Sequence, residues 1–596
     1  MSLNPWPLVA VAAVIVLTFV LGLRGSRRAK TTSDFLVAGR VVTVRNNAIA
    51  VAGLYLSAAS FLGIAGAVLR DGVDGLWYPV GLVAGHLVLL LLVVAPLRRS
   101  GAYTLPDFAE ARLGSVRLRR MVTVFVVLTC WIYLVPQLQG AGLTLAAVSG
   151  MPIWVGAVLV TVVVVVTVLA GGMRAVTTVQ VAQYWLKFVA MAVPAAVLLV
   201  AFLMDTDRQH RPLSEPVPPN FPVETTVDVR FEVRVQVVEP VLLQARGTVD
   251  GHPVDGAVYW GPGVHQVASG AELRFPAGAA VPVVVGAAAD NASWLRPQTG
   301  PDGASLLEIY STIFAAFLGA MGLPHVLVRF YTNPDGRSAR WTTLYALGYL
   351  GLFFLFPALL GALSRLYTPQ LLVTGHTDAA VLLLPTEMLD NWVGRVSAAL
   401  LAAGAFTAFL SVAAGLTVSM AGVLSTDVLS GKVQDFRLAT LVSGAMALVG
   451  AFAAFGLNSF QAVGLALALS ASTFCPLLVL GIWWRGLTPA GAVAGMLAGG
   501  GLTLVALVTV VVSGFTGEWV SPLLVQPAVV TTPLAFAVMW LVSRLTRHQV
   551  PADVGRSMVR MHAPDRLGLT QDRDVQRFGG SEEGERPGRG GTRRSC

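Results

Sequence analysis

The chain contains a series of long apolar stretches, and these limit its possible folds more than any other feature. A helix needs roughly 20 mostly apolar residues to cross a bilayer, and about thirteen segments meet that test. Their apolar runs are continuous, as in Ala157–Leu169, which favours helices over a membrane barrel because barrel strands alternate. Charged residues make up 12% of the chain, against about 25% in soluble domains. We therefore expect an all-α polytopic membrane protein.

Two parts of the chain do not fit this pattern. Residues 205–305 are rich in proline, and apolar residues alternate with polar ones in Val227–Val235, which predicts a small β-rich extracytoplasmic insert. The end of the chain is rich in Gly, Arg and Glu, which predicts disorder. The predicted parts are a first helix with a basic loop (1–46), a first half-core (47–204), the insert (205–305), a second half-core (306–484), two further helices (485–545) and a disordered cytoplasmic tail (546–596).

Basic residues cluster in loops 24–45 and 98–120, which should therefore be cytoplasmic. With an odd number of crossings, the N-terminus lies outside and the C-terminus inside. The formal net charge of +9 is spread over short loops rather than one stripe, so we expect lipid and no nucleic acid as partner. The sequence also has no nucleophile–base pair, phosphate-binding loop or metal-ligand spacing, and it suggests no cofactor and no obligate protein partner. These features argue against an enzyme.

Ionisable residues inside apolar spans are candidates for function because lipid makes them costly. The candidates are Lys187, His86 and His325. Lys187 lies about eleven residues into its span, roughly 16 Å along a helix, and so near mid-membrane. Its amine could pair with main-chain carbonyls, act as counter-charge for an anionic substrate, or accept a proton.

Helix-weakening residues interrupt two of the spans. The second contains Gly53, Gly63 and Gly66, and the seventh reads Leu-Gly-Ala-Met-Gly-Leu-Pro-His at 318–325. Such residues can break a helix where it lines a cavity. The two spans begin consecutive groups of five, spans two to six and seven to eleven, as an inverted-repeat core requires.

Four stretches resemble the sodium:solute symporter family, and within it the acetate and monocarboxylate branch. They are Thr-Ser-Asp-Phe-Leu-Val-Ala-Gly-Arg (32–40), Ser-Ala-Ala-Ser-Phe-Leu-Gly (57–63), Gly-Ala-Met-Gly-Leu-Pro-His (319–325) with Arg329-Phe330, and Trp-Trp-Arg-Gly (483–486) with Gly491 and Gly495. The resemblance implies a five-plus-five inverted-repeat core that works by alternating access. The expected activity is import of a small monocarboxylate of the acetate, propionate or pyruvate class with a cation.

The resemblance also implies the positions of two binding sites. The cation would bind to oxygens of Gly53, Leu56, Ala408 and Ser411. Close relatives have a second hydroxyl after this serine, but this chain has Val412, so sodium and protons both remain possible coupling ions, with Lys187 as the coupling or counter-charge residue. The predicted substrate residues are Trp131, Tyr133, Gln137, Gly319, Gly322, Leu323, Pro324 and His325.

A different class of function remains open on the sequence alone. A chain with an eroded cation site could be a transporter-like sensor that binds a solute and signals through its tail or its insert.

Overall fold

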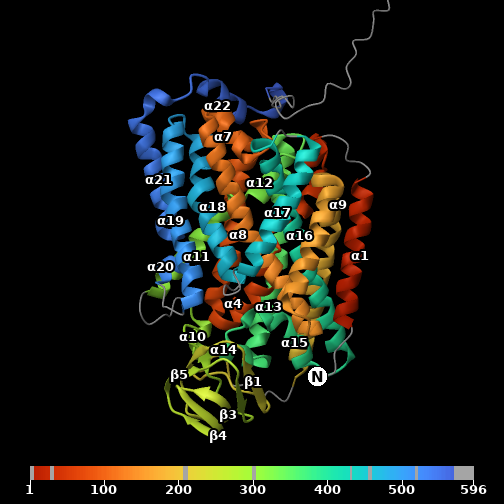
Figure 1. Ribbon diagram of the computed structural model, residues 1–596, viewed down its shortest axis with the longest axis vertical. Coiled ribbons are helices and arrows are strands. Elements are labelled where there is room, and N and C mark those ends of the chain that lie inside the picture. Colours follow the sequence, from red (N-terminus) through yellow and green to blue (C-terminus); the bar gives the residue numbers. More distant parts are fainter. Residues whose placement is uncertain are drawn as a thin grey trace, which may run out of the picture.

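The protein is a long helical bundle with a small sheet at one end (Figure 1). The computed structural model describes residues 6–26, 32–205, 212–297, 304–429, 432–453, 459–516 and 521–569. The helices up to the sheet are α1 (Trp6–Ser26), α2 (Thr32–Val37), α3 (Val44–Tyr55), α4 (Ile64–Asp71), α5 (Trp77–Val88), α6 (Val94–Arg99), α7 (Leu105–Leu113), α8 (Val116–Ser149) and α9 (Ile153–Met204).

The helices after the sheet complete the bundle. They are α10 (Asn291–Leu295), α11 (Ala304–Ala320), α12 (Pro324–Phe330), α13 (Gly336–Tyr367), α14 (Gln370–Thr374), α15 (Ala380–Met388), α16 (Trp392–Asp427), α17 (Val433–Ala453), α18 (Ser459–Trp483), α19 (Pro489–Thr516), α20 (Pro522–Val525), α21 (Ala528–Leu545) and α22 (Val554–His562). α16 and α18 are the most enclosed, with 89% of the apolar window of each buried, and the outer helices present apolar faces to lipid.

Eleven stretches of the described residues are long and apolar enough to cross a membrane, whereas the sequence predicts about thirteen. The difference lies in two long stretches, Ala59–Arg99 with 41 residues and Ile153–Met204 with 52. Each contains a glycine at positive φ, Gly72 (φ 65°) and Gly172 (φ 52°), where the chain departs from helical geometry. Each long stretch is counted once by its length and composition, although a turn divides it into two helical parts.

Both predicted helix breaks are present. α3 ends at Tyr55, and the chain returns to helix through a π-helical turn at Ala59–Gly63 that leads into α4. α11 ends at Ala320, and α12 begins at Pro324, whose fixed φ and missing N–H suit the first position of a helix. Each break leaves helix ends in the middle of the bundle.

Polar caps fix the starts of several helices at the end that carries α7 and α22. Thr104, Ser115 and Asp335 each accept a hydrogen bond from a main-chain N–H in the first turn of α7, α8 and α13, respectively. Gly114 then ends α7 in the left-handed conformation. The short α7 therefore turns the chain directly from one long helix into the next.

Strands occupy the centre of the segment 205–305. They are β1 (Thr225–Val229), β2 (Val233–Val237), β3 (Val241–Val249), β4 (His252–Trp260), β5 (Gly263–Val267), β6 (Ala271–Phe275) and β7 (Val283–Val284). They pair antiparallel in the order β1-β6-β3-β5-β2-β7, with β4 on β3. Alternate residues of β3, among them Val241 and Leu243, point into a core that also contains Leu372 of α14. The sheet thus packs on the bundle at the end opposite α22 (Figure 1).

The expectation of a disordered tail from residue 546 is wrong for its first part. α22 packs on α6, and the carboxylate of Asp565 accepts hydrogen bonds from Arg99 Nε (2.9 Å) and from the main-chain N–H of Arg337 (3.1 Å). Burial alone would raise the pKa of Asp565, but the hydrogen bonds and charge of Arg99, together with main-chain amides at the start of α13, lower it below its ordinary value. Residues 570–596 of the predicted tail lie outside the described residues.

Candidate transport site

The break between α3 and the following π-helical turn places several main-chain polar groups at the centre of the bundle. The last four carbonyls of a helix have no partner within it and must find one elsewhere. Tyr55 O accepts hydrogen bonds from Ser57 N (2.9 Å) and Ser60 Oγ (2.6 Å). The N–H of Ala58 donates to the side-chain oxygen of Gln137 (2.9 Å). The break is thus held open by specific partners.

Lys187 supplies the partner for two further carbonyls of this break. Its fully buried Nζ donates to Gly53 O at 2.6 Å and lies 3.4 Å from Leu56 O. These are the two main-chain oxygens that the sequence assigns to the cation site. The negative end of the α3 dipole also lies here, and it favours a positive charge. One of the alternatives that the sequence left open, pairing with carbonyls, is therefore realised at the predicted cation position.

The other half of the predicted cation site comes from α16. Ala408 and Ser411 are fully buried, three residues apart on the same helix. Ser411 O accepts a hydrogen bond from Gln180 Nε2 (2.7 Å), whereas Ser411 Oγ has no hydrogen-bond partner among the described residues. No group of three or more His, Cys, Asp or Glu in the described part of the chain could hold a metal ion.

Arg329 is a second buried cation, and it lies in the last turn of α12. Its side chain is fully buried. Its guanidinium donates to Thr177 Oγ1 (2.5 Å) and to the side-chain oxygen of Gln180. Gln180 therefore links the guanidinium of Arg329 to the main chain of Ser411. Neither Arg329 nor Lys187 forms an ion pair with any acidic residue that the structure describes.

Two of the predicted substrate residues, Tyr133 and His325, meet at the same break. Tyr133 OH lies 3.3 Å from Ser57 Oγ, and the Tyr133 ring packs edge-on against the His325 ring, with 5.2 Å between centroids. Both ring nitrogens of His325 are buried and have no hydrogen-bond partner among the described residues. By contrast, both ring nitrogens of His86 have one. Leaving a buried polar group without a partner is costly, so the ring nitrogens of His325 are available to hydrogen-bond a bound solute.

Gln137 lies at the break but in a different role from the one predicted. The resemblance placed it among the residues that contact the substrate. Its oxygen accepts from Ala58 N, and its Nε2 donates to Tyr133 O (3.3 Å). The side chain therefore positions the broken helix and the Tyr133 segment relative to each other.

The predicted substrate residues on either side of the second break mainly provide packing. A Cβ on Gly319 would lie 2.4 Å from Leu467 O, and one on Gly322 would lie 2.7 Å from Ser470 Oγ, so both glycines allow α11 to approach α18 closely. Leu323 O accepts from the first N–H groups of α12. Pro324 lines a cavity of about 20 Å³, which has room for about one water molecule.

Trp131 does not belong to this group. Its indole N–H donates to Met446 O (2.9 Å), and its ring packs on Gly450, both on α17. The side chain is half-buried on the side of α8 that faces α17. The structure therefore separates Trp131 from Tyr133 and His325.

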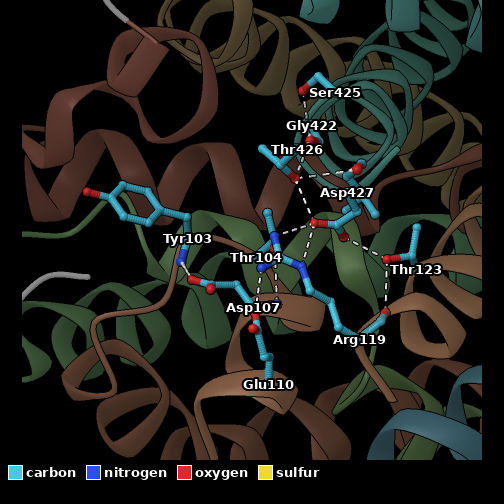
Figure 2. A network of polar contacts seen from close by, with 11 residues as sticks. Tyr103, Thr104, Asp107, Glu110, Arg119, Thr123, Gly422, Ser425, Thr426 and Asp427 are labelled. Carbon is cyan, nitrogen blue, oxygen red and sulfur yellow. Dashed lines mark hydrogen bonds and ion pairs between the residues drawn. The ribbon is translucent and has the colours of Figure 1, made fainter. Parts of the chain in front are cut away.

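A network of ion pairs joins α7, α8 and the end of α16 (Figure 2). Arg119 donates to Asp427 Oδ1 through Nε (2.8 Å) and Nη2 (2.5 Å), and to Glu110 Oε2 through Nη1 (2.5 Å). Thr123 Oγ1 donates to Asp427 Oδ2 (2.6 Å). The Asp427 side chain is only 1% exposed. The network fixes this end of α16, the helix that carries Ser411, against α8, the helix that carries Tyr133.

Sequence reasoning missed Asp427 entirely and quoted Ser57 and Arg329 only as parts of motifs. A signal was available for Arg329, because it follows His325 by four residues and so lies on the same helical face. Asp427 gave no comparable signal, because its partner Arg119 is 308 residues away.

The sodium:solute symporter family matches residues 35–207 and 277–499, which is more than half of the chain and leaves out most of the strands. An uncharacterized symporter of Bacillus subtilis, YwcA, is 27% identical over 550 residues, covering 89% of this chain and 92% of the relative. An uncharacterized symporter of Cupriavidus necator is 27% identical over 623 residues, covering 88% and 89%. The structure of a Na⁺-coupled sialic acid symporter, in a substrate-bound outward-open state, superposes with a TM-score of 0.58 at 14% identity, covering 91% of this chain and 98% of that one.

Proposed function

This chain belongs to the sodium:solute symporter family, and from that premise we propose that it imports a small monocarboxylate of the acetate, propionate or pyruvate class together with a cation. Members of this family are membrane transporters, not enzymes; they use sodium as the coupling ion and have no cofactor. The solute and the direction of transport are our proposal. It rests on charge, on the unpaired groups at the helix breaks, and on the 319–325 motif.

The observation that carries the proposal is an uncompensated positive charge at the centre of the bundle. Lys187 and Arg329 are both fully buried, and neither pairs with a described acidic residue. Two buried cations without an anion are unfavourable, so the arrangement favours a negatively charged solute. A neutral sugar or a cationic amine would leave this charge unbalanced.

The groups at the helix breaks suit a single small carboxylate. An N–H of His325 can donate to a carboxylate oxygen, and the hydroxyl of Ser57, which accepts a hydrogen bond from Tyr133 OH, offers a second donor. The surroundings are otherwise apolar and tightly packed, as with Leu323 and Pro324. Pockets that differ by one methyl group discriminate weakly, so several short acids would share the site.

The same breaks support an alternating-access mechanism with a five-plus-five repeat. They lie in the first helices of two groups of five, as expected for repeats that move against each other around a central site. We propose that Ala59–Arg99 and Ile153–Met204 each cross twice, because 41 and 52 helical residues span about 62 and about 78 Å, at least two bilayer cores of about 30 Å. That gives thirteen crossings, an outside N-terminus and sheet, and a cytoplasmic C-terminus.

Uptake into proteoliposomes tests this function. We expect purified protein to take up labelled acetate, propionate and pyruvate, but neither a neutral sugar nor choline, above the level of empty liposomes. Substituting His325→Phe, which keeps the ring contact with Tyr133 but removes both nitrogens, should lower uptake at least about tenfold, as expected for one lost charge-assisted hydrogen bond. Uptake of the sugar but of none of the acids would contradict the proposal.

The sensor alternative has no support from the relatives or from the matching structure, which are described as symporters. Solute binding without any counterflow would be the result in its favour.

A further inference from the structure

The coupling site contains a cation that belongs to the protein itself. We propose that the protonated amine of Lys187 takes the place of sodium in this site, so that the transporter couples its solute to protons. The inference rests on the proposed symport but concerns only the coupling ion. It departs from the sodium coupling that the family name describes.

The position expected for the coupling cation is already occupied by the Lys187 amine. Gly53 O and Leu56 O are the main-chain oxygens expected to bind the cation, and Lys187 Nζ lies 2.6 and 3.4 Å from them. The shorter distance lies at the short end of the range for hydrogen bonds from a charged donor. A sodium ion bound to the same oxygens would stand beside an ammonium of like charge. The two cations therefore exclude each other.

The site also offers few free oxygens to a sodium ion. Sodium is a hard cation that prefers several oxygen ligands. Ser411 Oγ is buried and has no hydrogen-bond partner among the described residues, and the next side chain on α16, Val412, has no oxygen. With Gly53 O and Leu56 O bound to the Lys187 amine, too few oxygens remain for sodium, whereas two carbonyls at a helix C-terminus suffice to orient an ammonium.

Few other ionisable groups surround Lys187. Helices α1, α3, α9, α12 and α13 contain no acidic residue, and Asp427 at the end of α16 pairs with Arg119. The ionisable groups near the amine are Tyr184 on its own helix, Tyr55 on α3, Tyr349 on α13 and Arg329 on α12. The hydroxyls of Tyr184 and Tyr55 donate to main-chain carbonyls. Lys187 is therefore the group at this site to which we assign the proton exchange.

The chemistry of the step is a simple proton transfer. When the site faces the cytoplasm, a water molecule takes one proton from the ammonium, the N–H bond breaks, and its electron pair stays on nitrogen. The products are a neutral amine and a hydronium ion. The neutral amine binds Gly53 O and Leu56 O less strongly, because the charge assistance is gone. The tie between α9 and the end of α3 then loosens, which couples proton release to movement at the helix break.

Sodium binding can be tested without knowing the solute. We would compare the midpoint of thermal unfolding of the purified protein in sodium chloride and in choline chloride at equal ionic strength. An ion that binds only the folded state raises the midpoint. We expect no sodium-specific rise for the wild type, and a rise of a few degrees for Lys187→Ala, which frees the two carbonyls. Lys432→Ala, at an exposed lysine, should behave as the wild type.

A sodium-specific rise in the wild-type protein would overturn the inference, and this outcome does not depend on whether Lys187→Ala folds. A transport measurement supplies the second arm. In sodium-free liposomes, an inward proton gradient should drive accumulation of labelled acetate above the level of protein-free liposomes, which neutral acetic acid enters by diffusion, and an added sodium gradient should not increase it. Lys187→Arg, which keeps the charge but does not release a proton, should reduce accumulation to the level of protein-free liposomes.

The two arms separate the possible failures. If no monocarboxylate enters under any gradient, the proposed solute is wrong, while the unfolding measurement still decides whether Lys187 has replaced sodium. If acetate enters only under a sodium gradient, the proposed solute is supported and the proton coupling through Lys187 is contradicted.

Discussion

The link between Arg119 and Asp427 offers the sharpest test of how the two halves of the bundle are held together. We consider the substitution Asp427→Asn, which keeps the size of the side chain and removes its charge. In the wild type, Arg119 donates twice to one carboxylate oxygen of Asp427, and Thr123 donates to the other. An amide in this place offers one acceptor and turns its NH₂ group toward existing donors.

The size of the effect follows from burial. The side chains of Asp427 and Arg119 are 1% and 13% exposed, so water does not replace the lost partner. Removing one member of a buried ion pair costs about 3–5 kcal/mol. Glu110 still accepts from Arg119, so the guanidinium keeps one anion, and we expect a loss at the lower end, about 3 kcal/mol.

Unfolding of the purified protein by sodium dodecyl sulfate, followed by tryptophan fluorescence, measures this loss. The matched control is Asp255→Asn, the same chemical change at an exposed position of β4, which should stay within about 0.5 kcal/mol of the wild type. If Asp427→Asn is as stable as this control, the network does not hold α16 against α8 and our reading of Figure 2 is wrong.

Three further predictions concern packing, pH and a corrected residue. Gly319→Ala should destabilise the protein by about 1–3 kcal/mol in the same unfolding assay, because its Cβ would overlap a main-chain oxygen of α18, whereas Gly348→Ala meets no atom within 4 Å and should not. The contact of Asp565 with Arg99 should be present above the ordinary pKa of an aspartate and weaken as the pH falls through the lowered pKa of the folded state, so hydrogen exchange in α22 should rise at acid pH, and at neutral pH in Asp565→Asn; unchanged exchange would argue against the contact. Trp131→Phe should change acetate uptake less than about twofold, since the ring faces α17, and a tenfold loss would return Trp131 to the substrate site.

The membrane character of the chain and both helix breaks could be predicted from sequence because each follows from a local rule. Lipid leaves the backbone no external hydrogen-bond partner, so apolar length alone indicates crossing helices. Glycine and proline weaken a helix wherever they occur, and they marked the breaks near Gly53 and Pro324. The number of apolar stretches is eleven rather than thirteen because Ala59–Arg99 and Ile153–Met204 each count once, although turns at Gly72 and Gly172 interrupt them.

The partners inside the bundle could not be predicted, because they are distant in sequence. Pairing with main-chain carbonyls was one of three alternatives for Lys187, and the carbonyls that it binds lie 134 and 131 residues away. Trp131 and Tyr133 lie two residues apart on a helix that is apolar on all sides, so no stripe indicated which of them faces the breaks. Arg329 lies one turn after the second break and is fully buried, but its partners Thr177 and Gln180 are 152 and 149 residues away.

Competition between acetate and acetamide tests the central claim most directly. Acetamide has the size and shape of acetate but carries no charge. We would measure counterflow of labelled acetate into proteoliposomes in the presence of equal concentrations of unlabelled acetate or acetamide. If the buried cations Lys187 and Arg329 select an anion, acetate should compete at least about tenfold more effectively, which corresponds to about 1.4 kcal/mol. Equal competition by acetamide would contradict the account.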